Sequence, residues 1–270
     1  MRNTLFYILF VVVLASCSEY SKVLKNGTTQ TKWAMADTMY NKKDYVRALP
    51  LYEELLDVYR GKPESEAIYF KYCYSNYYLG QFELAAFHFS NFVENYYNSK
   101  HLEECSFMYA KCIYGDALDP ELDQTNTSKA IVEIQNFLNN YPFSSYKEEC
   151  NTLLESLRKN LMYKSYKNGM LYFKMGDYTA TIVSLKNTLK DFPDVPNKSE
   201  IEFTILKSTY LLAKHSVLEK KEARYKDVFD AYNTFIRNNP GADKLQKEAA
   251  EINEKAKLEL ANFQKLNNNQ

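Results

Sequence analysis

The sequence predicts an all-α protein, an α-solenoid (superhelix) of about five stacked helix pairs. Gly and Pro are scarce, with 7 of each in 270 residues, which is too few turn residues for an all-β sandwich or barrel. A quarter of the residues are charged and 15% are aromatic, a composition typical of packed amphipathic helices. A segment with helical spacing also recurs along the chain, which predicts stacked repeats of one helical unit.

The N-terminus has the features of a secretory signal peptide. Arg2 precedes a short apolar run at residues 5–15, which is too short to span a bilayer as an ordinary transmembrane helix. The motif LASC at residues 14–17 resembles the bacterial lipobox. That resemblance implies that residues 1–16 are removed and that Cys17 carries acyl chains, which anchor a protein stably when there is more than one.

The residues after the lipobox predict a polar tether and bear on which membrane the protein is sorted to. Residues 17–30 are polar and show no periodic pattern, so we expect a lipidated N-terminal tether before the folded domain. Ser18 rather than Asp follows the cysteine. In the enterobacterial sorting pattern this favours the outer membrane.

The recurring segment occurs five times, at residues 42–60, 80–97, 127–142, 175–193 and 223–240. A small or medium residue aligns in every copy: Ala48, Ala85, Ala130, Thr181 and Val228. Residues four, seven and eight positions later are mostly apolar, which places them on one helix face. Thr188 is the one polar member of the column at offset seven. Asp44 and Asp177 are predicted N-caps, and Pro142, Pro193 and Pro240 are predicted to end their helices.

An aromatic helical segment precedes each copy, at residues 31–41, 65–79, 101–115, 150–174 and 199–219. Each unit is therefore predicted to be two antiparallel helices, which must stack because one pair cannot bury its faces alone. The turn, the small residue, the aromatic four positions later and the closing Pro resemble the tetratricopeptide repeat. We expect the repeat domain at 31–261, with an insertion loop near 118–127, and a polar, frayed tail at 262–270.

Composition and motifs exclude several classes of protein. Basic and acidic residues balance at 34 each, which argues against a basic nucleic-acid-binding surface. With three His, no C-x-x-C and no glycine-rich phosphate motif, the sequence predicts no metal site, no cofactor and no enzyme activity. Small buried packing residues are the favoured interpretation of Cys73 and Cys112. A disulfide among Cys73, Cys105, Cys112 and Cys150 stays open.

The lipobox and the irregular repeats together resemble the BamD family of outer-membrane lipoproteins, in the form found in Bacteroidetes. The segments CSEYSKVLKN, KDYVRALPLYEELLDVYRG, the LDQT loop and GDYTATIVSLKNTLKDFPD carry the resemblance. It implies a non-catalytic scaffold of the β-barrel assembly machinery, lipid-anchored to the outer membrane and facing the periplasm. The implied partners are a BamA-like barrel protein, other subunits of the machine, and unfolded outer-membrane proteins awaiting insertion.

The resemblance also implies where partners bind. The N-terminal repeats would receive unfolded barrel segments, and the C-terminal repeats would dock on the BamA-like protein. The position of each residue within its repeat, which we call repeat phase, gives candidate residues for a peptide groove on the first helices: Trp33, Asp37, Tyr40, Phe70, Tyr74 and Tyr77. Aromatic side chains there could stack on the aromatic end of a barrel strand, although core packing is the alternative for each. Candidate docking residues are Tyr225, Tyr232 and Arg237, with the following helix at 244–260.

Two other functions stay open at this point. The chain could be a different periplasmic repeat adaptor, for instance one that coordinates cell-wall synthesis. It could also be a glycan-binding surface lipoprotein of the SusD type, which its short length disfavours.

Overall fold

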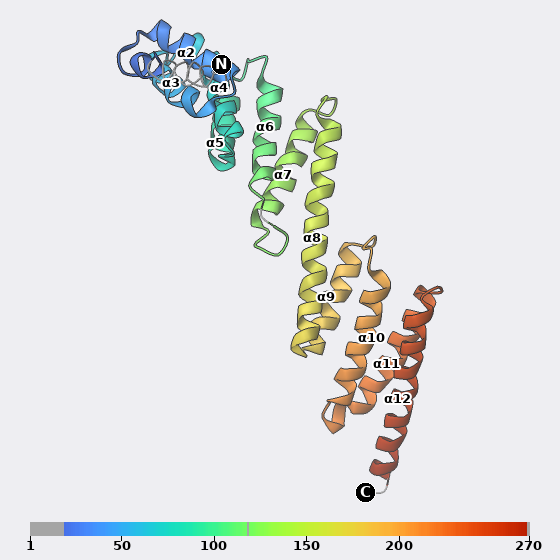
Figure 1. The fold of residues 1–270 in the computed structure, drawn as a ribbon. Helices are drawn as coiled ribbons and strands as arrows, with labels where there is room; N and C mark the ends of the chain where they lie inside the picture. Colours follow the sequence, from blue (N-terminus) through green and yellow to red (C-terminus); the bar gives the residue numbers. More distant parts are fainter. Residues whose placement is uncertain (1–18, 118, 269–270) are drawn as a thin grey trace, which may run out of the picture. The chain divides into compact units, whose positions relative to one another are not determined.

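The computed structural model describes residues 19–117 and 119–268, and all regular secondary structure in this part of the chain is helical (Figure 1). The predicted signal peptide and Cys17 lie outside the described residues. After a helical segment at residues 19–26, the helices are α2 (Thr29–Asn41), α3 (Tyr45–Val58), α4 (Glu64–Tyr78), α5 (Phe82–Asn95), α6 (Leu102–Gly115), α7 (Thr125–Asn140), α8 (Lys147–Met175), α9 (Tyr178–Asp191), α10 (Lys198–Lys214), α11 (Leu218–Asn238) and α12 (Asp243–Asn268). None of the described helices is long and apolar enough to cross a membrane.

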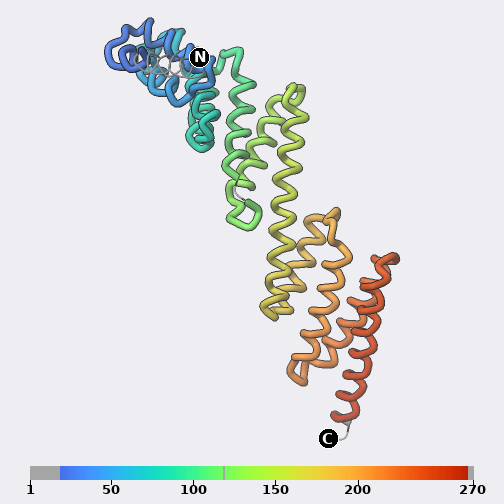
Figure 2. Tube along the Cα trace, viewed as in Figure 1, coloured from blue at the N-terminus to red at the C-terminus, as the bar shows by residue number. Residues whose placement is uncertain are grey.

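The helices group into two compact units, Met1–Leu157 and Arg158–Gln270, and α8 supplies residues to both. In the first unit, α3 packs between α2 and α4, α5 between α4 and α6, and α7 against α6. In the second unit, α10 packs against α9, α11 and α12. The trace in Figure 2 follows this alternation of helix and short turn through each unit. The predicted fold class, an α-solenoid of tetratricopeptide-type helix pairs, is confirmed.

The aligned positions of the repeats form the contacts between helices. All five small or medium residues are fully buried: Ala48, Ala85, Ala130, Thr181 and Val228. The residues four positions later are also fully buried in four copies (Tyr52, Phe89, Ile134 and Leu185), whereas Tyr232 is half-buried. The polar exception, Thr188, is buried too; its hydroxyl donates to the Ser184 carbonyl at 3.1 Å and lies 2.7 Å from the Ser165 hydroxyl. Satisfied hydrogen bonds explain why the core accepts it.

The starts and ends of the second helices follow the predicted signals. The Asp44 side chain accepts a hydrogen bond from Arg47 N at 3.2 Å, and Asp177 accepts one from Ala180 N at 2.9 Å, so both predicted N-caps are confirmed. Helices α7, α9 and α11 each end two residues before their proline, at Asn140, Asp191 and Asn238. The closing prolines therefore act as predicted.

One turn conformation precedes three of the second helices. Lys43, Gly80 and Gly176 each lie one residue before the N-cap and have positive φ angles of 60°, 73° and 78°. In the first turn, Lys43 N donates to Tyr40 O and Asp44 N donates to Met39 O, both at 2.9 Å. The other two turns repeat this pattern. The left-handed conformation favours glycine, so Lys43 is the unusual member.

The boundaries differ from the sequence expectation in three places. Residues 19–26 of the expected tether are helical, and the Tyr20 hydroxyl donates to the Arg47 carbonyl at 3.0 Å. The first-helix segment of the fifth pair was expected at 199–219, but α10 ends at Lys214 and the 21-residue α11 begins at Leu218. Helix α12 runs to Asn268 and crosses into the expected polar tail. Residues 19–26 and the end of α12 are mostly polar, so the sequence there lacks the apolar pattern by which a helix is recognised.

Candidate partner-binding surfaces

The first candidate surface lies on the first helices of the first unit, where α2 supplies three of the six predicted groove residues. The Trp33 ring packs edge-on against Tyr59, with 5.1 Å between centroids. The Tyr40 ring lies 5.4 Å from Tyr45 and 6.2 Å from Tyr52, both edge-on. Trp33 and Tyr40 are half-buried and pack against the core of α2, α3 and α4. Both rings therefore serve the core as well as the surface.

Asp37 on α2 forms an ion pair with Lys71 on α4, and so links the first helices of the first two helix pairs. Its Oδ1 accepts a hydrogen bond from the Tyr52 hydroxyl and another from Lys71 Nζ, each at 2.8 Å. Burial, and then the hydrogen bond to Asp37, raise the pKa of Tyr52 well above its usual range. Lys71 Nζ also lies 6.0 Å from the centroid of the Tyr40 ring. The predicted groove residue Asp37 is thus already paired with Lys71.

The three predicted residues on α4 lie among further aromatic rings. Phe70 lies 4.9 Å from Tyr74 and 4.2 Å from the His101 ring, measured between centroids. The Tyr74 hydroxyl donates to Glu104 Oε1 at 2.5 Å, and burial is the main cause of its raised pKa. Tyr77 contacts Phe82 at 5.7 Å, again between ring centroids. All three side chains are half-buried and pack against the core that spans α4 to α8.

Two tyrosines that repeat phase did not select complete this surface. Tyr78 is 50% exposed and stacks on Tyr45 with 4.6 Å between centroids, and it also lies 5.7 Å from Tyr74. The spacing of Tyr74 and Tyr78, four residues apart on one helix, is the signal that could have identified Tyr78. Tyr45 belongs to a second helix, so first-helix phase could not include it. We call the set Tyr40, Tyr45, Lys71, Tyr74, Tyr78 and Glu104 the aromatic surface.

The cysteines lie in the core and offer no reactive site. Cys73, Cys105, Cys112 and Cys150 are free and fully buried in one cluster of the first unit. Burial raises the pKa of the Cys112 thiol to about 12 and that of Cys150 to about 11. Within residues 19–117 and 119–268, no three His, Cys, Asp or Glu side chains converge as a metal site would require. These thiols therefore act as small packing groups.

The predicted docking residues in the second unit differ in exposure. Tyr225 is buried, and its hydroxyl donates to Glu259 Oε2 at 2.5 Å, which ties α11 to α12. Glu259 also accepts from the Tyr210 hydroxyl at 3.0 Å. Tyr232 is half-buried against the same core, and Arg237 is exposed. Arg237 is therefore the most accessible of the three to a partner and Tyr232 is partly accessible, whereas the buried Tyr225 holds the two helices together.

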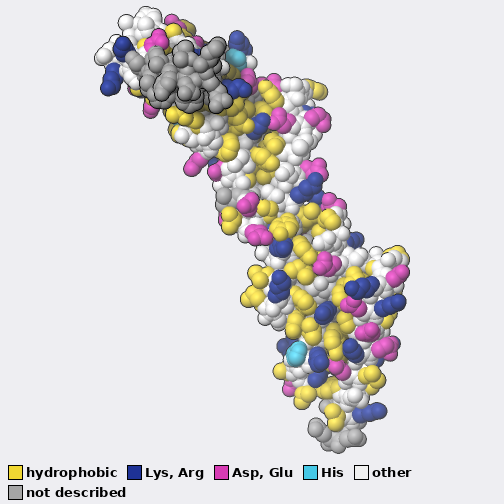
Figure 3. All heavy atoms as spheres, viewed as in Figure 1, with side chains coloured by type: hydrophobic (Ala, Val, Ile, Leu, Met, Phe, Trp, Pro, Cys, Tyr) yellow, Lys and Arg dark blue, Asp and Glu magenta, His cyan; other side chains and the backbone are white. Residues whose placement is uncertain are grey.

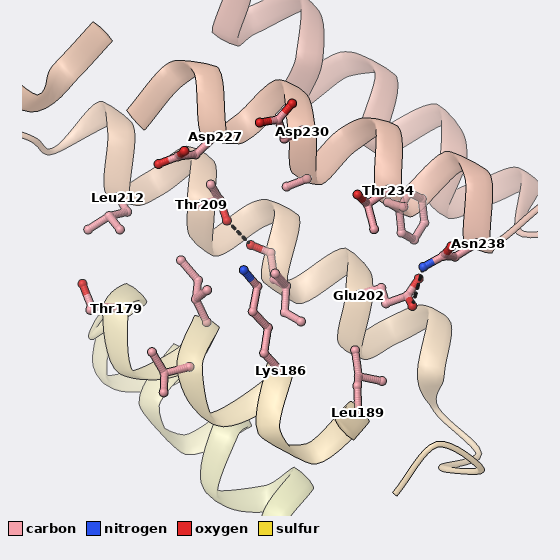
Figure 4. Close-up of a pocket in the computed structure, with 15 residues that line it drawn as sticks. Thr179, Lys186, Leu189, Glu202, Thr209, Leu212, Asp227, Asp230, Thr234 and Asn238 are labelled. Atoms are coloured by element: carbon pink, nitrogen blue, oxygen red, sulfur yellow. Dashed lines mark hydrogen bonds between the residues drawn. The ribbon is translucent and has the colours of Figure 1, made fainter. Parts of the chain in front are cut away.

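The second unit also contains a groove that sequence reasoning missed. It has a volume of about 740 Å³ and is lined by α9, α10 and α11 (Figure 4). Apolar side chains gather among charged ones over the region of α9 and α10 (Figure 3). The lining residues come from three helices, so repeat phase on any one helix could not reveal the groove.

Solved structures that are similar to this chain cover most of its length at low sequence identity. A search of curated proteins found no match. Among solved structures, a tetratricopeptide-repeat protein from Bacteroides fragilis is 13% identical, covering 83% of this chain and 97% of that chain, with a TM-score of 0.38. The TPR2AB domain of yeast Sti1, solved with pHSP90, is 11% identical, covering 85% and 98%, with a TM-score of 0.40.

The family model described as outer membrane lipoprotein, YfiO, matches residues 25–224. The match begins in the helical segment before α2 and continues into α11, so it takes in both units. The chain therefore belongs to the YfiO family of outer membrane lipoproteins.

Proposed function

We propose that this protein is a non-catalytic scaffold of the β-barrel assembly machinery. Acyl chains on Cys17 anchor it to the outer membrane on the periplasmic side. It docks on a BamA-like barrel protein and helps recruit and insert unfolded outer-membrane β-barrel proteins. The family match over residues 25–224 is the observation that carries this proposal, and the lipobox at residues 14–17 agrees with it.

The aromatic surface is the proposed receiving site for unfolded barrel segments. Its exposed ring, Tyr78, stacks on Tyr45 and can extend that stack to an incoming aromatic side chain. Its charged groups already have partners: Lys71 forms an ion pair with Asp37, and Glu104 accepts from the Tyr74 hydroxyl and lies 3.2 Å from His101 Nδ1. An incoming carboxylate would therefore compete with Asp37 for Lys71. We infer that recognition here depends mainly on ring stacking and apolar burial, with charge in a secondary role.

A pair of exposed aromatic residues allows a matched test of this surface. Tyr78→Ala should reduce photo-crosslinking of an unfolded barrel segment to the mature chain several-fold, since stacking on one ring contributes about 0.5–1.5 kcal/mol. Phe143→Ala is the control, because Phe143 is 99% exposed in the same unit and lies in the turn between α7 and α8. Equal losses in the two variants would count against the aromatic surface.

Docking on the BamA-like protein is proposed to use the exposed side of α11, around Arg237. The test is a pull-down of the lipidated mature protein from detergent-solubilised outer membrane, with mass spectrometry of its partners. A BamA-like barrel should be recovered, and Arg237→Glu should weaken its recovery more than Lys100→Glu, an exposed control in the first unit. Recovery of cell-wall synthases or glycan-uptake proteins without that barrel would refute the assembly role and leave the family and fold unchanged.

A further inference from the structure

We propose that the groove between α9 and α11 binds an amphipathic helix of a partner protein, one whose aliphatic face is bordered by Lys or Arg. Helices α9 and α11 both pack against α10, which forms the floor between them. Figure 4 shows Lys186 and Leu189 on the α9 wall and Asp227 and Asp230 on the α11 wall. The inference assigns a ligand class to a groove that the proposed assembly role does not require.

The groove is apolar where an occupant would sit deepest. Ile205 and Phe235 on its floor and wall are nearly fully buried, and each belongs to a different core cluster of the second unit. Ile182, Leu189 and Leu212 are half-buried along the lining, and Val183 is 55% exposed. Aliphatic side chains from a partner would cover these groups and remove apolar surface from water. The groove therefore favours an occupant with a continuous aliphatic face.

The charges around the groove indicate which charged side chains should border the aliphatic face of the occupant. Asp227 and Asp230 are exposed and three residues apart on α11, and neither makes an ion pair or hydrogen bond with another residue in the described part of the chain. Glu202, by contrast, is buried and accepts hydrogen bonds from the Nδ2 atoms of Asn238 and Asn239. Two unpaired carboxylates on one wall attract basic side chains. Lys186 on the opposite wall likewise has no hydrogen-bond or ion-pair partner among residues 19–117 and 119–268, and it favours an acidic residue there.

The geometry favours a helix over an extended strand. All three walls are helices whose backbone groups are already paired within the helix, so they offer no sheet edge to an incoming strand. An extended segment would leave its own backbone N–H and C=O groups without partners against aliphatic walls, which is unfavourable. A helix satisfies these groups internally and would complete a four-helix arrangement with α9, α10 and α11. Apolar residues at three- and four-residue spacing would then face α10.

Site-specific photo-crosslinking in the native cell tests this proposal. A photoreactive amino acid replaces Val183 inside the groove, or Val46 as an exposed control in the first unit, and the crosslinked peptides are sequenced. We expect the Val183 adduct to map to one partner segment with aliphatic residues at helical spacing and flanking Lys or Arg. An adduct with a second copy of this chain, an adduct lacking that pattern, or no adduct specific to Val183 would overturn the proposal.

Charge reversal then tests the acidic wall with the crosslinked segment as a synthetic peptide. Asp230→Lys should weaken binding of the peptide to the mature chain at least tenfold. Glu251→Lys, which makes the same charge change at an exposed site on α12, should change it less than twofold. Equal affinities for the two variants would overturn the assigned role of the carboxylates. Recovery of the BamA-like barrel by wild-type protein is scored separately, so failure of this inference and failure of the proposed assembly role give different results.

Discussion

Replacing Lys43 by glycine is expected to stabilise the first unit. Lys43 has a φ of 60° in the turn between α2 and α3, where the equivalent turns carry Gly80 and Gly176. The left-handed conformation costs a residue with a Cβ roughly 1–2 kcal/mol. Glycine in turn loses about 0.5–1 kcal/mol of additional chain entropy on folding. Since the Lys43 side chain is exposed, the two effects leave a net gain of about 0.5–1 kcal/mol in the free energy of unfolding.

The single tryptophan provides a local assay for this change. Trp33 packs against Tyr59 within the α2–α3 pair, so its fluorescence reports unfolding of the first unit. With a urea m-value of about 2 kcal/mol/M, Lys43→Gly should raise the unfolding midpoint by about 0.3–0.5 M. The backbone hydrogen bonds of Lys43 N and Asp44 N do not depend on the side chain, so the m-value should stay the same.

The matched opposite change is Gly80→Ala in the next turn of the same unit. A Cβ at Gly80 would meet no atom within 4 Å, so the positive φ is the only source of strain, and stability should fall by about 1 kcal/mol. If Lys43→Gly lowers the midpoint at constant m-value, or if Gly80→Ala leaves it unchanged, backbone strain does not govern these turns and the reasoning is wrong.

Three further measurements test the core, the thiols and one ion pair. Phe89→Ala, at a fully buried position, should lower the free energy of unfolding by about 3–5 kcal/mol in urea titrations. In a mature chain carrying Cys17→Ser, all four core thiols should resist a thiol reagent at pH 8 and react after denaturation; fewer than four would reveal a disulfide. Hydrogen bonds from Arg158 lower the pKa of the Asp194 carboxyl to about 2, so this pair stabilises the fold above the ordinary Asp pKa and is lost as pH falls towards 2. Arg158→Ala should raise the Asp194 pKa in an NMR titration, although a backbone hydrogen bond that also lowers it would remain; an unchanged value would contradict the assignment.

The second helices of the repeats were predictable because their signals are local. A buried small residue such as Ala85 and an aromatic four positions later lie on one helix face whatever the rest of the chain does. A cap such as Asp177 acts on an amide three residues away. The end of α10 was less predictable, because Lys214 and Leu218 have no strong helix-breaking residue between them.

The candidate sites were predictable only in part. Repeat phase selected Tyr74 as a candidate groove residue, and the structure places its side chain half-buried; repeat phase could not show its hydrogen bond to Glu104 on the next first helix. Aromatic spacing does not distinguish a surface ring from a core ring, as Tyr225 shows by its burial beneath α12. Contacts between residues far apart in the sequence depend on how helices stack, and no local pattern contains that information.

By itself, the sequence determined that this chain is a stack of helix pairs, and it predicted a lipoprotein-type N-terminus. Helical period, caps and prolines act over a few residues, so they can be recognised without coordinates. Tertiary structure alone decided that Asp37 pairs with Lys71, that Tyr45 stacks on Tyr78, and that α9 and α11 stand apart over α10 to form a groove. These features arise where separate helices meet, and the distances between helices are set by the packing of whole side chains.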